Sequence, residues 1–332
     1  MLPLEQKILD TIQDAFPLEE RPYKVLADLF NEQGSGFGQP ALQPVSEQDV
    51  FETVESLRKS GVIRRIGGIY DSKRLGFISR LCAGKVPMRA NGAKDDSALA
   101  EFVDAVNRIP AITHNYVRSH EYNVWFTVIA ENESDVQKTV DSLCANTELH
   151  DVHILLVTKK FKIDTVMTRG ERPNVIVRNV AAKQTIAAIT QSDRDRIRVA
   201  CTDIPHTLTP FADWGVSTEG LRDDLAQKRM RRFGAILRHQ QAGFAYNAMV
   251  CFRVDSDSRA GMTLAENPHI SHCYERPEFE GFPYSLYAMM HAQSAEDLES
   301  FIKDAAASIG GPDYVVLNSL QELKKTSFQF FA

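Results

Sequence analysis

Residues 64–67 read RRIG, and nearly the same motif returns as RRFG at residues 231–234. A Gly-Phe pair follows each copy at the same spacing, at residues 76–77 and again at residues 243–244. Self-similarity of this kind is the signature of an internal repeat, and it decides how the remainder of the chain is interpreted.

Two later motifs repeat in the same order. Residues 114–118 read HNYVR and are answered by HCYER at residues 272–276, while YNVW at residues 122–125 is answered by YSLY at residues 284–287. The second copy carries four extra residues in the intervening turn, within residues 277–283. We therefore interpret the chain as two homologous halves.

The start of each half predicts helices followed by a β-wing. Apolar residues at helical spacing, a Gly/Pro-rich loop at residues 34–44 and a suitable N-cap at Ser46 predict three helices before residue 62. Residues 62–70 then form two short extended runs around a Gly-Gly turn, which predicts a winged helix-turn-helix. Residues 192–200 and 217–229 repeat the scheme in compressed form.

The rest of each half alternates strands and helices. The first half is expected to contain strands at residues 78–86, 112–119, 122–130 and 152–159, and helices at residues 96–108 and 134–143. The second half supplies matching segments at residues 248–254, 269–276, 284–292, 295–308 and 313–320. The βαββαβ order of the first half predicts a ferredoxin-like sandwich with helices on one face of the sheet.

The expected fold class is therefore α+β, with two tandem copies of a winged helix-turn-helix and a ferredoxin-like domain. The expected domains are winged helices at residues 1–75 and 166–242 and ferredoxin-like domains at residues 76–165 and 243–332.

Composition excludes several classes of protein. A hydrophobic fraction of 43% with 25% charged residues is ordinary for a globular chain and argues against disorder or a membrane bundle. The five cysteines are odd in number and lack C-x-x-C spacing, and the N-terminus lacks a signal-peptide pattern, so we expect a cytoplasmic protein. The net charge of −6 argues mildly against nucleic-acid binding.

A winged helix-turn-helix followed by βαββαβ resembles the Lrp/AsnC architecture of transcriptional regulators. The first-half motifs at residues 63–77 and 114–127 resemble one subunit type of siroheme decarboxylase. The second-half motifs at residues 231–249, 273–276 and 283–291 resemble the partner subunit type. The resemblance covers nearly the whole chain and implies a fusion of the two types.

This resemblance implies removal of the C12 and C18 acetate carboxyls of siroheme, giving 12,18-didecarboxysiroheme for haem d1 or alternative haem b biosynthesis. The iron arrives with the substrate, and the macrocycle can act as the electron sink, so no metal of its own and no added cofactor are expected. The expected partners are this tetrapyrrole and an internal pseudo-dimer of the two halves. A further homodimer is left open.

Strand geometry selects the candidate catalytic residues. Side chains alternate between the faces of a strand, so His114, Tyr116 and Arg118 share one face, which we expect to be free of helices. If the two sheets meet by these faces, a polar-lined cavity lies between the halves. Loss of CO2 leaves a carbanion-like methylene that must be protonated. We expect His114 and His120 to be proton donors and Tyr116 to donate or to orient.

Siroheme carries many carboxylates and a flat ring, so its binding needs guanidinium and aromatic groups. The expected substrate-binding residues are Arg65, Arg74, Arg118, Tyr122, Arg232, His239, Tyr274, Arg276, Tyr284 and His291. The halves differ, because His120 has no second-half counterpart and His291 aligns with Ile129. The sequence does not decide which half turns over.

Two other functions stay open on sequence grounds. The first is a DNA-binding regulator. However, residues 1–66 hold eleven acidic and only seven basic side chains, and this negative balance disfavours binding to DNA phosphates. The second is a tetrapyrrole carrier or sensor, which the same Arg, Tyr and His residues would serve.

Overall fold

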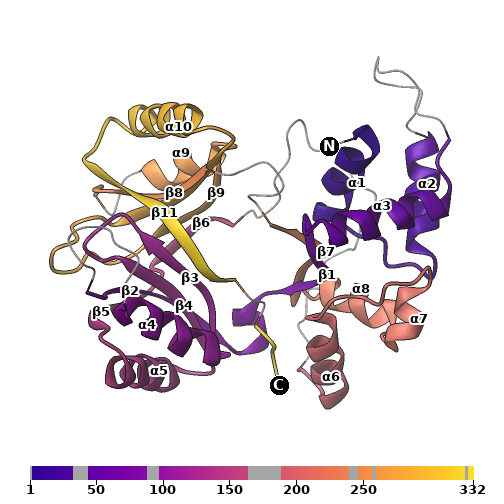
Figure 1. Ribbon diagram of the computed structural model, residues 1–332, viewed down its shortest axis with the longest axis horizontal. Coiled ribbons are helices and arrows are strands. Elements are labelled where there is room, and N and C mark those ends of the chain that lie inside the picture. The colour runs from indigo at the N-terminus through magenta and orange to yellow at the C-terminus, as the bar shows by residue number, and fades with distance from the viewer. Residues whose placement is uncertain are drawn as a thin grey trace. The chain divides into compact units, whose positions relative to one another are not determined.

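The computed structural model describes residues 2–32, 44–87, 97–163, 188–238, 246–255, 259–325 and 328–332. The chain forms two compact units (Figure 1). Unit 1 comprises residues 1–75, 166–242 and 329–332, and unit 2 comprises residues 76–165 and 243–328. Each unit therefore draws on both halves of the sequence. The last four residues belong to unit 1, outside the ferredoxin-like domain expected at residues 243–332.

Unit 1 contains two sets of helices, each followed by one strand. The first half supplies α1 (Pro3–Asp14), α2 (Pro22–Glu32), α3 (Glu47–Lys59) and β1 (Ile63–Tyr70). The second half supplies α6 (Gln191–Ala200), α7 (Pro210–Trp214), α8 (Thr218–Ala226) and β7 (Met230–Leu237). The predicted cap of α3 forms, because the Ser46 hydroxyl accepts the Asp49 N–H at 3.2 Å. The short helix α7 lies between the two helical segments that the sequence predicts, at residues 192–200 and 217–229.

The expected β-wings are wrong in their pairing. β1 runs straight through Gly67 and Gly68 and pairs antiparallel with β7, with Gly67 opposite Gly234. The two halves thus share one two-stranded ribbon in place of two hairpins. A Cβ on Gly67 would lie 2.4 Å from the carbonyl oxygen of Thr202, and one on Gly234 would lie 2.5 Å from that of Ile12. The glycines therefore serve the close approach of two helix ends to the ribbon, which explains why they do not mark a turn.

Unit 2 contains both ferredoxin-like segments. The first half supplies β2 (Ile78–Lys85), α4 (Ser97–Arg108), β3 (Ile112–Arg118), β4 (Val124–Ala130), α5 (Glu133–Asn146), β5 (His150–Leu155) and β6 (Lys159–Ile163). The second half supplies β8 (Tyr246–Phe252), α9 (Ala260–Glu266), β9 (Ile270–Glu275), β10 (Leu286–Ala292), α10 (Ala295–Ser308) and β11 (Tyr314–Lys325). Both halves contain the order βαββαβ, with β6 added in the first half, which confirms the ferredoxin-like α+β class.

The strands of unit 2 are hydrogen-bonded in the order β5-β2-β4-β3-β11-β8-β10-β9-β6. Residues 314–318 of β11 pair with β8 of the same half, and the strand from Ser319 onward pairs with β3 of the other half. β6 pairs in the same manner with β9. The predicted single strand at residues 152–159 is therefore wrong, because the chain leaves β2 after Leu155 and joins the other half at Lys159.

Helices cover the outer side of each half-sheet, with α4 and α5 on one side and α9 and α10 on the other (Figure 1). The helix-free faces meet, as expected. Trp125 packs against Phe282 and Tyr287, with ring centroids 5.7 and 6.4 Å apart, and Leu155 and Leu317 belong to the same cluster. The middle of this contact is filled by aromatic and aliphatic side chains, in contrast to the polar lining that we expected there.

Two elements go beyond the sequence expectations. α9 was not expected, and β11 runs five residues past the predicted end at residue 320. Among the helices that the structure describes, none is long and apolar enough to cross a lipid bilayer.

Candidate functional site

The two repeated His-Tyr-Arg stripes lie on the helix-free faces of unit 2. In β3, Tyr116 lies opposite Trp125, which belongs to the cluster between the sheets. In β9, Tyr274 lies opposite Tyr287 of the same cluster. Directly opposed residues project to the same side of a sheet. Both stripes therefore face the interior between the two halves, as the alternation of side chains predicted.

Each stripe begins with a histidine held beside a hydroxyl group. His114 Nδ1 lies 2.9 Å from the hydroxyl of the preceding threonine, and His272 Nδ1 lies 2.9 Å from Ser271 Oγ. In the second half, Ser271 Oγ also lies 2.8 Å from His291 Nε2. A hydroxyl can donate to one of these nitrogens while it accepts from the other. In the second half Ser271 thus links His272 to His291, whereas Ile129 stands at the equivalent of His291 in the first half.

Each stripe ends in a buried arginine that binds a strand of the other half. Arg118 donates to the carbonyl oxygen of Leu317 at 3.0 Å, and Arg276 donates to that of Leu155 at 2.9 Å. Each guanidinium also lies over the tyrosine ring of its own stripe, at 5.0 and 5.2 Å. Leu317 lies in β11, which crosses from the second half of the sheet to the first. Leu155 is the last residue of β5, after which the chain crosses to the second half.

These two arginines are buried and have no ion-pair partner among the described residues. The Nε atom of each is buried and has no hydrogen-bond partner in the described structure. Tyrosine and cysteine side chains lie near both charges. Burial lowers the pKa of Arg118 to about 10 and lowers the pKa of Arg276 as well, because desolvation disfavours the charged guanidinium. A ligand with carboxylates would supply the missing counter-charge.

A line of polar groups joins Arg118 to the second half. Its guanidinium donates to Ser319 Oγ at 3.0 Å, and the Ser319 hydroxyl donates to Asn247 Oδ1 at 2.6 Å. Asn247 is the cross-strand neighbour of His291. The sequence does not single out Ser271 and Ser319, which belong to no motif, and it shows Asn247 only as part of the second-half motif, because the strand register alone brings the three together.

His120 and Tyr122 lie in the turn between β3 and β4. The Tyr122 N–H donates to His120 Nδ1 at 3.1 Å, and the two rings stack with 6.0 Å between centroids. The Tyr122 hydroxyl lies 3.0 Å from both Asp151 Oδ2 and the carbonyl oxygen of Glu280, and 3.2 Å from His153 Nε2. Desolvation lowers the pKa of His120, so its neutral form is favoured.

The segment with the four extra residues covers this turn. Phe282 packs edge-on against His120 at 5.3 Å, and Phe279 packs edge-on against Tyr122 at 5.0 Å. Tyr284 in turn packs against Phe282, with 5.0 Å between centroids. The divergence of this turn was visible in the sequence, but its contact with the first half was not. The second half therefore builds part of the surroundings of a first-half histidine.

Arg65 and Arg232 bind main-chain carbonyls in unit 1. Arg65 donates to the carbonyl oxygen of Thr202, just after α6, at 3.3 Å. Arg232 donates to the carbonyl oxygen of Gln13 in the last turn of α1. A cation at a helix C-terminus satisfies free carbonyls and complements the helix dipole. The structure thus accounts for both arginines of the repeated motif without a ligand.

Two further predicted residues stand apart from these groups. Arg74 is exposed in a 3₁₀ turn of unit 1, where its N–H donates to Asp71 Oδ1 at 3.2 Å. His239 lies outside the described residues. The site residues of unit 2 are therefore the ones that the structure brings together.

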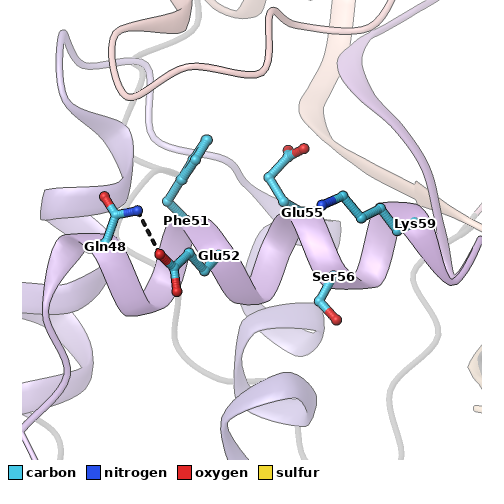
Figure 2. Close-up of a pocket in the computed structure, with 6 residues that line it drawn as sticks. All are labelled: Gln48, Phe51, Glu52, Glu55, Ser56 and Lys59. Carbon is cyan, nitrogen blue, oxygen red and sulfur yellow. Dashed lines mark hydrogen bonds between the residues drawn. The ribbon is translucent and has the colours of Figure 1, made fainter.

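A hollow of about 470 Å³ lies along α3 in unit 1 (Figure 2). It is lined by Gln48, Phe51, Glu52, Glu55, Ser56 and Lys59. In a DNA-binding winged helix, the third helix reads the major groove. On α3, however, Arg58 is nearly buried and paired with Glu55 and Asp203, which leaves Lys59 as the exposed base of a helix that also exposes the acids Asp49 and Glu52. This surface is unsuited to phosphates.

Comparison with known proteins gives the family. The AsnC-like ligand binding domain family matches residues 74–162 and 241–324. Siroheme decarboxylase from Hydrogenobacter thermophilus is 30% identical over 340 residues, which is 98% of this chain and 94% of the relative. The siroheme decarboxylase alpha subunit of Desulfovibrio desulfuricans is 38% identical over 48% of this chain and 80% of the subunit. The beta subunit of Oleidesulfovibrio alaskensis is 37% identical over 43% of this chain and 97% of the subunit.

Solved structures agree with these matches. The crystal structure of the siroheme decarboxylase NirDL is similar with a TM-score of 0.65 and 28% identity, covering 99% of this chain and 94% of that chain. A second NirDL structure, in co-complex with an iron-uroporphyrin III analogue, gives a TM-score of 0.63 and 26% identity over 99% and 95% of the two chains. With a match along nearly its whole length, the chain belongs to the siroheme decarboxylase family and fuses two subunit types in one polypeptide.

Proposed function

We propose that this chain removes the C12 and C18 acetate carboxyls of siroheme and releases 12,18-didecarboxysiroheme for haem d1 or haem b biosynthesis. As a member of the siroheme decarboxylase family it is a carboxy-lyase. The observation that carries the site assignment is the repeated His-Tyr-Arg stripe, which faces the interior of unit 2 in both halves and ends in a buried arginine without an ion-pair partner among the described residues. An anionic ligand suits that charge, and the relative solved with an iron-uroporphyrin III analogue binds such a molecule.

The reaction needs one bond cleavage and one protonation at each acetate. The bond from the methylene carbon to its carboxylate breaks, CO2 leaves, and the electron pair remains on the methylene carbon, where the macrocycle delocalises it. A proton from the protein then converts the methylene into a methyl group. No net oxidation or reduction occurs, so the proposal needs no added cofactor.

The proton donors in this proposal are histidines. His114 is held beside a hydroxyl at the start of its stripe, and His120 is held by a main-chain N–H in the adjacent turn. Tyr116 lies between His114 and Arg118, so it orients the ring or donates in turn. The Ser271, His272 and His291 chain gives the second half a separate proton path, and the two acetates are served by unequal surroundings.

The arginines hold carboxylates that do not react. Clamping the scissile carboxylate would stabilise the ground state more than the transition state and would slow the reaction. Arg118 and Arg276 are the proposed anchors, with Tyr274 and Tyr284 as aromatic contacts. For Arg65 and Arg232 we propose helix capping in place of substrate binding, since the carbonyls that they bind lie at the ends of α6 and α1.

The test is anaerobic incubation of the purified chain with siroheme and no other addition, followed by mass spectrometry of the extracted tetrapyrrole. We expect sequential loss of the mass of one and then two CO2. His114→Ala and His120→Ala should each lower turnover by about 100-fold, the lower end for a general acid, while leaving siroheme binding intact. Bound but unchanged siroheme would support a carrier or sensor, and binding of duplex DNA without siroheme binding would support a regulator.

A further inference from the structure

We propose that Asp151 is a positioning residue for His120, acting through Tyr122, and that the second-half segment at residues 277–283 completes this arrangement. The proposal rests on the proposed function, because it assigns His120 the role of proton donor. It moves Tyr122 from the substrate-binding group to the groups that orient the histidine.

The hydrogen bond to His120 determines which ring nitrogen carries its proton. Its Nδ1 accepts the main-chain N–H of Tyr122 at 3.1 Å, so in the neutral ring the proton must lie on Nε2. Within the described residues, Nε2 has no hydrogen-bond partner. Stacking on Tyr122 and the edge-on contact with Phe282 hold the plane of the ring. His120 thus presents an N–H of fixed direction.

Tyr122 is itself held at every polar atom. Its N–H is given to His120, its carbonyl accepts Trp125 Nε1 at 2.7 Å, and its hydroxyl lies 3.0 Å from both Asp151 Oδ2 and the Glu280 carbonyl. The single hydroxyl proton already has two acceptors. A tyrosine held in this way orients its neighbours and has no donor left for a substrate carboxylate.

Asp151 anchors the hydroxyl of Tyr122. Its carboxylate accepts from Tyr122 and pairs with Lys85 Nζ at 2.9 Å and with His153 Nε2 at 3.1 Å. Lys85 also lies over the Tyr122 ring at 4.4 Å. Asp151 adopts a φ of 49°, a left-handed conformation that residues other than glycine seldom occupy.

The arrangement of His120, Tyr122 and Asp151 has no equivalent in the second half. The second half has no histidine at the position of His120, and its extra residues instead supply Phe279, Phe282 and the Glu280 carbonyl to the first-half turn. The two halves therefore differ in function at this turn, with one providing the donor and the other its wall.

The first experiment measures the state of His120 without turnover. The full-length chain is labelled with ¹⁵N-histidine, and His120→Gln identifies the resonance of this ring in two-dimensional NMR spectra. We expect wild type to show the Nε2–H tautomer, and Tyr122→Phe and Asp151→Asn to show a mixture of tautomers. An unchanged His120 spectrum in both variants would overturn the proposal, even if the chain decarboxylates siroheme.

The second experiment is a double-mutant cycle on siroheme decarboxylation. Tyr122→Phe and Asp151→Asn should each lower kcat about tenfold with little change in KM, a part of the roughly 100- to 10,000-fold that a general acid provides. In a His120→Ala background, the same changes should have no further effect. Asp141→Asn and Tyr314→Phe are the matched controls, and they should retain wild-type kcat.

Both outcomes of this cycle are informative. If Asp151→Asn lowers kcat equally with and without His120, Asp151 acts by another route and the proposal fails. Thermal melting of every variant separates misfolding from mispositioning, and Tyr122→Phe keeps the aromatic packing should Asp151→Asn fail to fold. Absence of turnover in wild type would reject the proposed function and leave the NMR result as the test of the positioning.

Discussion

Buried charges are arranged differently in the two units. In unit 1, Asp224 is fully buried and accepts two bonds from Arg196, at 3.0 and 2.8 Å, and one from the Tyr70 hydroxyl at 2.9 Å. In unit 2, Arg118 is also buried, but among the described residues it contacts main-chain, hydroxyl, thioether and aromatic groups and no carboxylate. A compensated cluster is typical of structure, whereas a cation without its anion indicates a place for a ligand.

Asp224→Asn should therefore destabilise unit 1 strongly. Arg196 and Arg229 would lose a buried partner, and breaking a buried ion pair from one side costs about 3–5 kcal/mol. Hydrogen exchange followed by mass spectrometry would show the loss in α8 and β1, with unit 2 as the internal reference. Asp195→Asn, which removes an exposed ion pair with Arg198, should cost less than about 1 kcal/mol. Equal protection in both variants would contradict the assignment.

Residue patterns predicted one group of side chains well and another poorly. The alternation of a strand placed His114, Tyr116 and Arg118 on one face, because that inference needs only local geometry. The same reasoning could not reveal that Arg65 caps a helix, since its acceptor lies 137 residues away in the other half. Asp151 escaped for the same reason, because its place beside Tyr122 follows from the register of distant strands.

At the scale of elements, the glycine ribbon β1–β7 replaces the two expected wings. Composition alone predicts a turn at the Gly-Gly pair of β1. The structure uses it for contact, since Gly67 meets the end of α6 and Gly234 meets the end of α1. The ribbon thus lets each helix end touch the strand of the opposite half, with Arg65 and Arg232 as caps.

Gly67→Ala should destabilise unit 1 by about 1–3 kcal/mol, as overpacking does. Its Cβ would meet the main-chain oxygens of Thr202 and Ala200, which cannot rotate away. Gly84→Ala in β2 is the comparison, because the nearest atom there is the flexible end of the Leu149 side chain. Urea unfolding of both variants measures the difference. A larger loss for Gly84→Ala would show that the crowding at the ribbon does not constrain it.

At the scale of the whole chain, neither half is complete without the other. In unit 1, β1 pairs only with β7, and in unit 2, β11 and β6 each pair with a strand of the opposite half. The order of elements within each half was predictable, because hydrophobic periodicity and turn residues are local signals. The exchange of strands was not, since either half could form its own sheet by the same local rules.

This exchange leads to a prediction about dissection. Residues 1–165 and 166–332, produced as two separate chains, should each be unstable alone because every interhalf strand would expose an unpaired edge and part of the apolar cluster around Trp125. Produced together, they should copurify as a one-to-one complex with the circular dichroism spectrum of the intact chain. A tag on one half and size-exclusion chromatography would measure this. Two halves that each remain folded and monomeric would show that strand exchange is dispensable, and the fusion would then be a tether between independent domains and not the means by which both are built.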